Sequence, residues 1–164
     1  MVAYSFQKRF IGQVLAGLEP GPWLPGMKRH TLHAPREGRS PHVRPEQPVH
    51  LYTAMRTKQC RQLGRAVCRL QMPVLLLWDG ERLGIARATG AAPRSCVGDL
   101  APVVRELMSG PPLVSYFNET MDEFARTDGF ADADEMARFF DAPSLSASFC
   151  MEMVLIAWSP EVAE

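Results

Sequence analysis

The sequence predicts an α+β fold, a small mixed or closed β-barrel decorated by short α-helices. Strand-like and helix-like segments do not alternate regularly along the chain, which argues against a doubly wound parallel sheet. The strand candidates are short, and closure into a barrel would remove their exposed edges. With 164 residues the chain fits one domain, and we expect residues 1–164 to form it.

The N-terminal part is expected to hold one helix between two extended segments. Apolar residues recur every four positions over 5–17, which is typical of a helix that buries one face. Ser5 suits its N-cap and Gly17 the position after its end. A short strand at 2–5 precedes this helix, and an extended segment at 28–33 follows it.

Two polar segments rich in proline and glycine are expected to be flexible, basic loops. They cover about 18–27 and about 34–48. Proline removes a backbone donor and fixes its own backbone angle, so neither a helix nor a central strand suits them. Trp23, inside the first loop, is expected to anchor it to apolar surface.

The middle of the chain alternates in the manner of strands. We expect strands at 49–55 and 60–70, with Gly64 marking a bulge or a bend in the second. Residues 73–86 suit a hairpin, because the Asp-Gly pair at 79–80 favours a type I′ turn.

Three helices and a last strand are expected in the C-terminal part. The first helix covers 99–110. The second covers 118–130, capped by Asn118 and ended by Gly129. The third covers 132–140, where Asp132 and Glu135 have capping-box spacing and Met136, Phe139 and Phe140 form the buried face. Residues 148–160 are apolar at both alternating sets of positions, which suits a strand covered on both faces.

The charges are divided unequally between the two halves of a chain that is neutral overall. Residues 1–69 contain 12 Lys and Arg against 3 Asp and Glu, and residues 70–164 contain 6 against 15. Such asymmetry favours an anionic partner for the basic half. The alternative is that the acidic C-terminal half masks the basic face.

Several classes of protein are not indicated by the sequence. The N-terminus lacks the apolar core of a signal peptide and the apolar runs are too short to span a membrane, so we expect a soluble, cytoplasmic protein. Four cysteines without a C-x-x-C pair suit reduced thiols, and we expect neither metal nor cofactor. A monomer is favoured.

Basic and hydroxyl-bearing residues form two candidate groups. In the first, a Lys28 desolvated in a cleft and crowded by Arg29, Arg56 and Lys58 would lose proton affinity and could act as a base or nucleophile. The alternative is a solvated cation that binds phosphate. In the second, Tyr52 could stack on a base while Arg56 and Lys58 contact phosphate, or Tyr52 and Lys58 could cleave a phosphodiester. The alternative is an ordinary solvated turn.

Four segments together resemble the ASCH family: "SFQKRFIGQVLAG", "MKRHT", "LYTAMRTKQCR" and "DGFADADEMARFF". The resemblance extends from about Tyr4 to Trp158. It implies a barrel similar to the PUA domain and a link to RNA binding. In small members it implies a Lys-Thr-Glu site that hydrolyses the amide of N4-acylated cytidine. The matching residues are Lys28, Thr31 and Asp128, which is one methylene shorter than the glutamate. Arg9 matches an arginine of the same pattern.

The leading expectation is therefore an RNA- or nucleotide-binding ASCH domain with a basic cleft in its barrel. The residues expected to bind nucleic acid are Arg9, Lys28, Arg29, Tyr52, Arg56 and Lys58. The alternative is a hydrolase that acts in the same cleft, either on RNA phosphodiesters or on an N4-acylcytidine-type amide, with Lys28, Thr31, Asp128, Tyr52 and Lys58 as catalytic residues. A second alternative is a protein-interaction module that uses the acidic helices around 122–141. Whether the chain is an enzyme stays open at this point.

Overall fold

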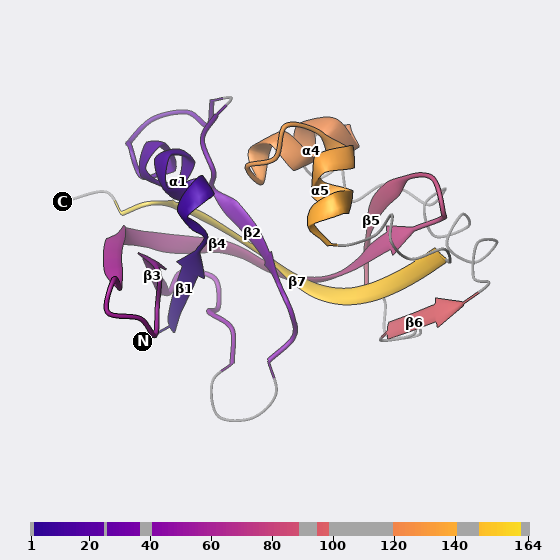
Figure 1. Cartoon of the computed structure of the whole chain (residues 1–164). Coiled ribbons are helices and arrows are strands. Elements are labelled where there is room, and N and C mark those ends of the chain that lie inside the picture. Colours follow the sequence, from indigo (N-terminus) through magenta and orange to yellow (C-terminus); the bar gives the residue numbers. More distant parts are fainter. Residues whose placement is uncertain are drawn as a thin grey trace. The chain divides into compact units, whose positions relative to one another are not determined.

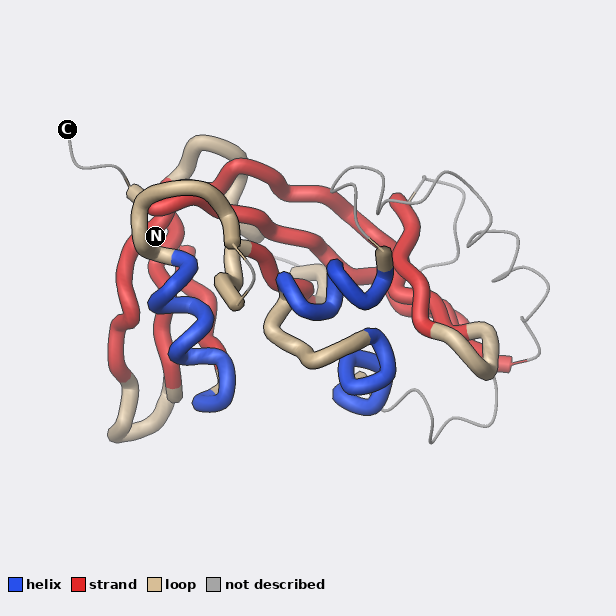
Figure 2. The backbone as a smooth tube through the Cα atoms, turned by 90° about the horizontal axis from the view of Figure 1, so that it is seen from above, coloured by secondary structure: helices blue, strands red, loops and turns tan. Residues whose placement is uncertain are grey.

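The computed structural model shows a mixed α+β fold (Figure 1). It describes residues 2–24, 26–36, 41–88, 120–140 and 148–161, and the backbone of 95–98. Strands make up more of the described backbone than helices do, and the helices are short (Figure 2). The elements in chain order are β1 (Val2–Phe6), η1 (Lys8–Phe10), α1 (Ile11–Gly17), β2 (His30–His33), β3 (Pro48–Thr53), β4 (Arg61–Trp78), β5 (Leu83–Arg87), β6 (Ser95–Gly98), α4 (Met121–Thr127), α5 (Ala133–Phe139) and β7 (Ser148–Pro160).

The described strands form one seven-stranded sheet. Its order is β1-β3-β4-β7-β2, with β5 paired to β4 and β6 paired to β7. β1 and β3 run parallel, whereas β3 and β4 run antiparallel. β1 and β2 end the order, so the described strands confirm the α+β class without showing a closed barrel.

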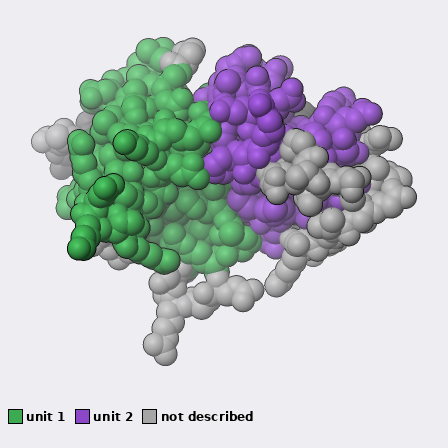
Figure 3. All heavy atoms as spheres, viewed as in Figure 1, with its two compact units in different colours: residues 1–71, 127–129, 155–164 green, residues 72–126, 130–154 purple. Residues whose placement is uncertain are grey.

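The chain divides into two compact units, which Figure 3 colours green and purple. Unit 1 comprises residues 1–71, 127–129 and 155–164, and unit 2 comprises 72–126 and 130–154. Each unit has buried apolar side chains of its own. Within the described residues, no helix has the length and apolar character needed to cross a membrane.

In unit 1 the helix begins later than the sequence predicts. Ser5 and Phe6 belong to β1, where they pair with Tyr52 and Thr53 of β3. Ser5 is not the N-cap, because its hydroxyl accepts a hydrogen bond from the Met55 N–H at 3.2 Å. Pairing with β3 therefore extends the strand into the expected helix, and η1 and α1 follow after Gln7.

Two glycines of unit 1 allow close packing. The pairing of β3 with β4 slips between Leu51 and Tyr52, so Leu63 bulges beside Gly64, as predicted. A Cβ on Gly64 would lie 2.6 Å from a methyl carbon of Leu18, so a larger residue there would require the Leu18 side chain to shift. Gly17 is the last residue of α1, and a Cβ there would collide with the backbone carbonyl of Lys28.

In unit 2 the predicted hairpin is confirmed, and β4 and β5 form it. The predicted turn type, I′, is wrong. Trp78 pairs with Leu83, and the Asp79 N–H donates to the Arg82 carbonyl at 3.3 Å. The turn is therefore centred on Gly80 and Glu81, and only Gly80 has a positive φ, of 102°. The Asp79 carboxylate accepts from the N–H groups of Glu81 and Arg82, at 2.9 and 2.8 Å, which holds this turn in place.

The helices of unit 2 begin at capping residues. Thr120 and Glu123 form a reciprocal capping box at the start of α4, with bonds of 2.6 and 3.3 Å. The predicted cap Asn118 and the predicted helix 99–110 lie outside the described residues. Asp132 caps α5 as predicted, accepting from the Glu135 N–H at 2.7 Å.

The predicted buried face of the third helix is only partly correct. Met136 is fully buried, whereas the side chain of Phe139 is 41% exposed. Phe139 instead packs against Phe130 and Phe140, with both pairs of ring centroids 5.2 Å apart.

Candidate functional site

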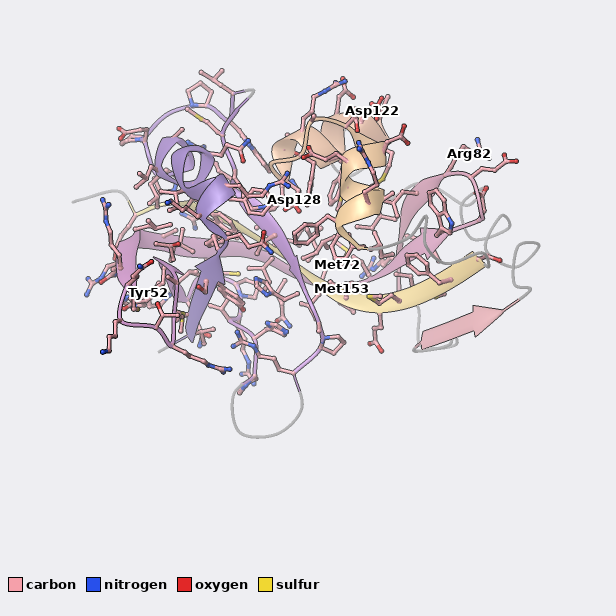
Figure 4. All side chains as sticks on the ribbon, viewed as in Figure 1. Tyr52, Met72, Arg82, Asp122, Asp128 and Met153 are labelled. Atoms are coloured by element: carbon pink, nitrogen blue, oxygen red, sulfur yellow. The ribbon has the colours of Figure 1, made fainter. Side chains whose placement is uncertain are left out.

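A buried lysine and a buried aspartate form an ion pair inside unit 1. The Lys28 ammonium donates to Asp128 Oδ1 at 2.5 Å and also to the Asp128 backbone carbonyl. The two side chains are 2% and 6% exposed. Asp128 directly follows α4 (Figure 4), and Gly129, with a φ of 100°, turns the chain there. The structure thus joins two residues 100 positions apart that the sequence analysis assigned to one site.

Helix α1 holds both segments of this pair. The Lys28 N–H donates to the Gln13 carbonyl at 2.9 Å, and Gly17 lets the Lys28 backbone approach the end of the helix. The Gln13 carboxamide donates to the Gly129 carbonyl at 3.3 Å. One residue of α1 therefore contacts the lysine segment through its backbone and the aspartate segment through its side chain.

Arg29 holds the loop that follows α1. Its guanidinium donates to the carbonyls of Gly17, Glu19 and Gly21, at 2.9, 2.7 and 2.9 Å. These carbonyls lie at and beyond the C-terminal end of the helix, where backbone acceptors lack helical partners. Arg29 is 6% exposed, so the phosphate-binding role predicted for it would require these bonds to break.

His30 is part of the site, although the sequence analysis did not assign it a role. Its Nδ1 lies 3.4 Å from Asp128 Oδ1, and its Nε2 lies 2.8 Å from the Thr127 hydroxyl oxygen. The ring is fully buried and meets the Trp23 ring edge-on, with the centroids 5.4 Å apart. The sequence did contain a signal that could have placed His30 in the site. Lys28 and His30 are two residues apart, and this spacing puts both side chains on one face of an extended chain.

Burial and mutual charge shift the pKa values of the cluster. Burial raises the pKa of Asp128 to about 6, although the Lys28 ammonium opposes this shift. Burial lowers the pKa of Lys28, with Asp128 opposing the shift and Arg9 adding to it. Burial and the Lys28 charge together hold the pKa of His30 well below its ordinary value. Each shift favours the neutral form of its group.

The environment of Lys28 differs from the predicted crowding by Arg29, Arg56 and Lys58. The cation that affects its pKa is Arg9, whose guanidinium lies 4.8 Å from the centroid of the Phe10 ring. The Lys28 ammonium lies 5.1 Å from the same centroid and 5.9 Å from that of Phe6. Aromatic faces attract cations, so these rings stabilise the buried ammonium.

Thr31, the third residue of the predicted catalytic set, is placed differently. It is buried in β2, next to His30. No hydrogen bond joins its side chain to Lys28 or Asp128 within the described residues. Alternation along an extended chain directs Thr31 away from the face shared by Lys28 and His30.

The second predicted group lies elsewhere in unit 1. Tyr52 is half-buried near the end of β3, and Figure 4 shows it well apart from Asp128. Arg56 and Lys58 are exposed in the turn at 54–60 between β3 and β4. The predicted cations therefore divide into buried Lys28 and Arg29, which pair with Asp128 or hold a loop, and exposed residues on η1 and on the turn at 54–60, namely Arg9, Arg56 and Lys58.

The described residues contain this buried ion pair but no group of side chains suited to hold a metal ion. No three His, Cys, Asp or Glu side chains lie close enough together to hold an ion in the part of the chain that the structure describes. Cys60 is an exposed free thiol and Cys68 a buried one. The pKa values of Lys28 and Asp128 are displaced toward each other, and displaced values of this kind are concentrated at functional sites.

Comparison with known protein families, with curated proteins and with solved structures finds no match to this chain. The resemblance to the ASCH family stays a prediction, and the case for the site depends on its geometry.

Proposed function

We propose that the chain is a hydrolase that cleaves the amide of an N4-acylated cytidine with Lys28 and Asp128, and that its strands correspond to a PUA-like barrel. The observation that carries the proposal is the ion pair itself, which is buried, 2.5 Å long and formed by two of the three residues matched to the ASCH hydrolase site. Perturbed ionisable groups of this kind concentrate at catalytic sites.

In this mechanism Asp128 is the general base and Lys28 stabilises the negative charge that develops. The Asp128 carboxylate takes a proton from a water that attacks the acyl carbonyl. The Lys28 ammonium stabilises the negative oxygen of the tetrahedral intermediate. The proton held by Asp128 then passes to the leaving N4 nitrogen as the carbon–nitrogen bond breaks, so that cytidine and a carboxylic acid are released. His30 is a positioning residue, since it contacts Asp128 at 3.4 Å.

Substrate reaches the pair by displacing the segment that carries Trp23. The Trp23 ring packs against His30, and its indole N–H donates to the Met27 carbonyl at 2.9 Å. Trp23 is half-buried and its neighbour Leu24 is 50% exposed, so moving this segment uncovers less apolar surface than opening the core would.

The test is product formation by the purified chain. Wild-type protein is incubated with N4-acetylcytidine and, in parallel, with end-labelled RNA, and products are separated by chromatography. We expect cytidine and acetate, and at least a hundredfold loss of turnover in Lys28→Met and Asp128→Asn, which is the scale of general acid–base catalysis. Arg69→Met, which removes an exposed cation, is the control and should retain turnover.

Two results would contradict the proposal: a wild-type protein that releases no cytidine, or a folded Lys28→Met variant that keeps the wild-type rate. Thr31→Ala tests the third matched residue, and an unchanged rate would remove it from the catalytic set. Cleavage of the labelled RNA that is lost in Lys58→Ala would instead favour the phosphodiesterase alternative.

A second candidate, RNA or nucleotide binding, is favoured by the exposed cations of the turn at 54–60. Arg56 and Lys58 are exposed, and no Asp or Glu occurs between Glu46 and Asp79. Binding to single-stranded RNA should weaken with salt, and each phosphate-contacting cation removed should reduce the log–log slope by about 0.7. A slope unchanged in Arg56→Ala and Lys58→Ala would argue against this candidate.

A further inference from the structure

An open pocket of about 400 Å³ lies in unit 1 outside the Lys28–Asp128 pair. It is formed where the chain passes from β1 into η1 and α1, and where β3 enters the turn at 54–60. Its volume is within the range of small-ligand pockets, roughly 300–1,000 Å³. Neither Lys28 nor Asp128 lines it.

The charge around this pocket is positive. Lys8 is the charged residue among those that line it, and it is exposed. Both segments that supply the lining, 1–18 and 47–78, contain no Asp or Glu. Arg56 and Lys58 are exposed on the turn that contributes Ala54 and Gln59 to the lining. Such a site concentrates small anions.

The walls of the pocket supply two further kinds of contact. Ile11, which is half-buried, and Phe6, which is 5% exposed, provide a small apolar surface, against which a flat ring can lie. Gln7 and Gln59 provide exposed carboxamides, each of which can donate and accept hydrogen bonds. A ligand with an anionic end and a planar apolar end matches both the charge and the walls.

The turn that forms one side of the pocket is held in a defined conformation. The Met55 N–H donates to the Ser5 hydroxyl at 3.2 Å, which ties the turn to β1. The Thr57 hydroxyl donates to the Ala54 carbonyl at 2.8 Å and accepts from the Gln59 N–H at 3.1 Å. A rim ordered before binding lowers the entropy cost of association.

We propose that this pocket binds an aromatic phosphate, meaning a phosphate monoester whose organic part carries an aromatic ring, with the phosphate at Lys8 and the ring against Phe6 and Ile11. Arg56 and Lys58 add to the attraction from the adjoining turn. This site goes beyond the proposed hydrolase, because binding here involves neither Lys28 nor Asp128.

The experiment is calorimetric titration of the intact chain with four probes: phenyl phosphate, cytidine 5′-monophosphate, cytidine and inorganic phosphate. We expect the two aromatic phosphates to bind more tightly than either cytidine or inorganic phosphate. Lys8→Ala should weaken their binding at least tenfold, the scale of one hydrogen bond to a charged group. Arg44→Ala, which removes an exposed cation from outside the pocket lining, should leave it unchanged.

The comparison between the two aromatic phosphates identifies the source of the ligand. Tighter binding of the nucleotide, reduced by Gln7→Ala or Gln59→Ala, would show that a base edge is recognised. Equal binding would show that the aromatic phosphate alone suffices. Cytidine binding as tightly as its monophosphate, an undiminished affinity in Lys8→Ala, or no binding of either aromatic phosphate would overturn the proposal. Probe binding and cytidine release are separate measurements on the same wild-type protein, so failure here and failure of the hydrolase proposal are distinguishable.

Discussion

Removing Lys28 should reveal how strongly the fold depends on its pair with Asp128. Lys28→Met keeps an unbranched side chain of similar length but leaves the Asp128 carboxyl buried without its cation. Breaking a buried ion pair by deleting one partner costs about 3–5 kcal/mol. With a urea m value of about 2 kcal/mol/M, the unfolding midpoint should fall by roughly 2 M at pH 8.

The pH dependence of this loss follows from the raised pKa of Asp128. At pH 8 the carboxylate of the wild-type protein is ionised and the pair is complete. Below a pH of about 6 Asp128 is protonated in the folded protein, and the pair contributes less. The destabilisation caused by Lys28→Met should therefore be smaller at pH 5 than at pH 8.

An exposed ion pair in the same unit provides the matched control. Arg69 Nη1 and Glu46 Oε2 are 2.7 Å apart, but the two side chains are 48% and 71% exposed. Arg69→Met should change the free energy of unfolding by less than about 1 kcal/mol, because exposed pairs contribute little. The double variant Lys28→Met/Asp128→Asn should be more stable than the sum of the single changes indicates. Additive losses, or equal losses for the buried and exposed pairs, would refute the reasoning.

Two further predictions concern the surroundings of the pair. Gly17→Ala should lower the free energy of unfolding by about 1–3 kcal/mol in urea melts, because the alanine Cβ would collide with the Lys28 carbonyl and the helix would have to move. An unchanged unfolding midpoint would show that Gly17 and the Lys28 backbone are packed less closely than described. His33 should contribute to acid denaturation, because burial lowers its pKa from 6.5 to about 3. Between these pH values the folded protein binds fewer protons than the unfolded chain, so the folded protein loses stability as the pH falls. At about 1.4 kcal/mol per pKa unit, the loss of stability is at most about 5 kcal/mol. His33→Gln should reduce the difference in the free energy of unfolding between urea melts at pH 7 and pH 4.5. An undiminished difference would assign the loss to other groups.

Features encoded by residues close together in the sequence were predictable. The capping role of Asp132 follows from its spacing to Glu135, and the bulge beside Gly64 follows from a glycine inside a strand pattern. The ion pair was predictable only through the family resemblance that matched Lys28 and Asp128. No local pattern connects residues 100 positions apart.

Features that depend on tertiary partners were not predictable in the same way. Ser5 looks like a helix cap until β3 pairs with its segment and takes it into the sheet. Arg29 looks like a solvent-facing cation until the carbonyls at the end of α1 come within reach of its guanidinium. In both cases the competing partner lies in another segment, and tertiary contact overrides the local preference.

The most direct test of a buried, mutually paired Lys28 and Asp128 is titration of the Asp128 carboxyl by carbon-13 NMR, in wild-type protein and in Lys28→Met. We expect a midpoint near pH 6 in wild type, because burial raises the pKa, and a higher midpoint in the variant, because the ammonium that opposes the shift is gone. A carboxyl that titrates near its ordinary value of 3.8 in both proteins would contradict the account.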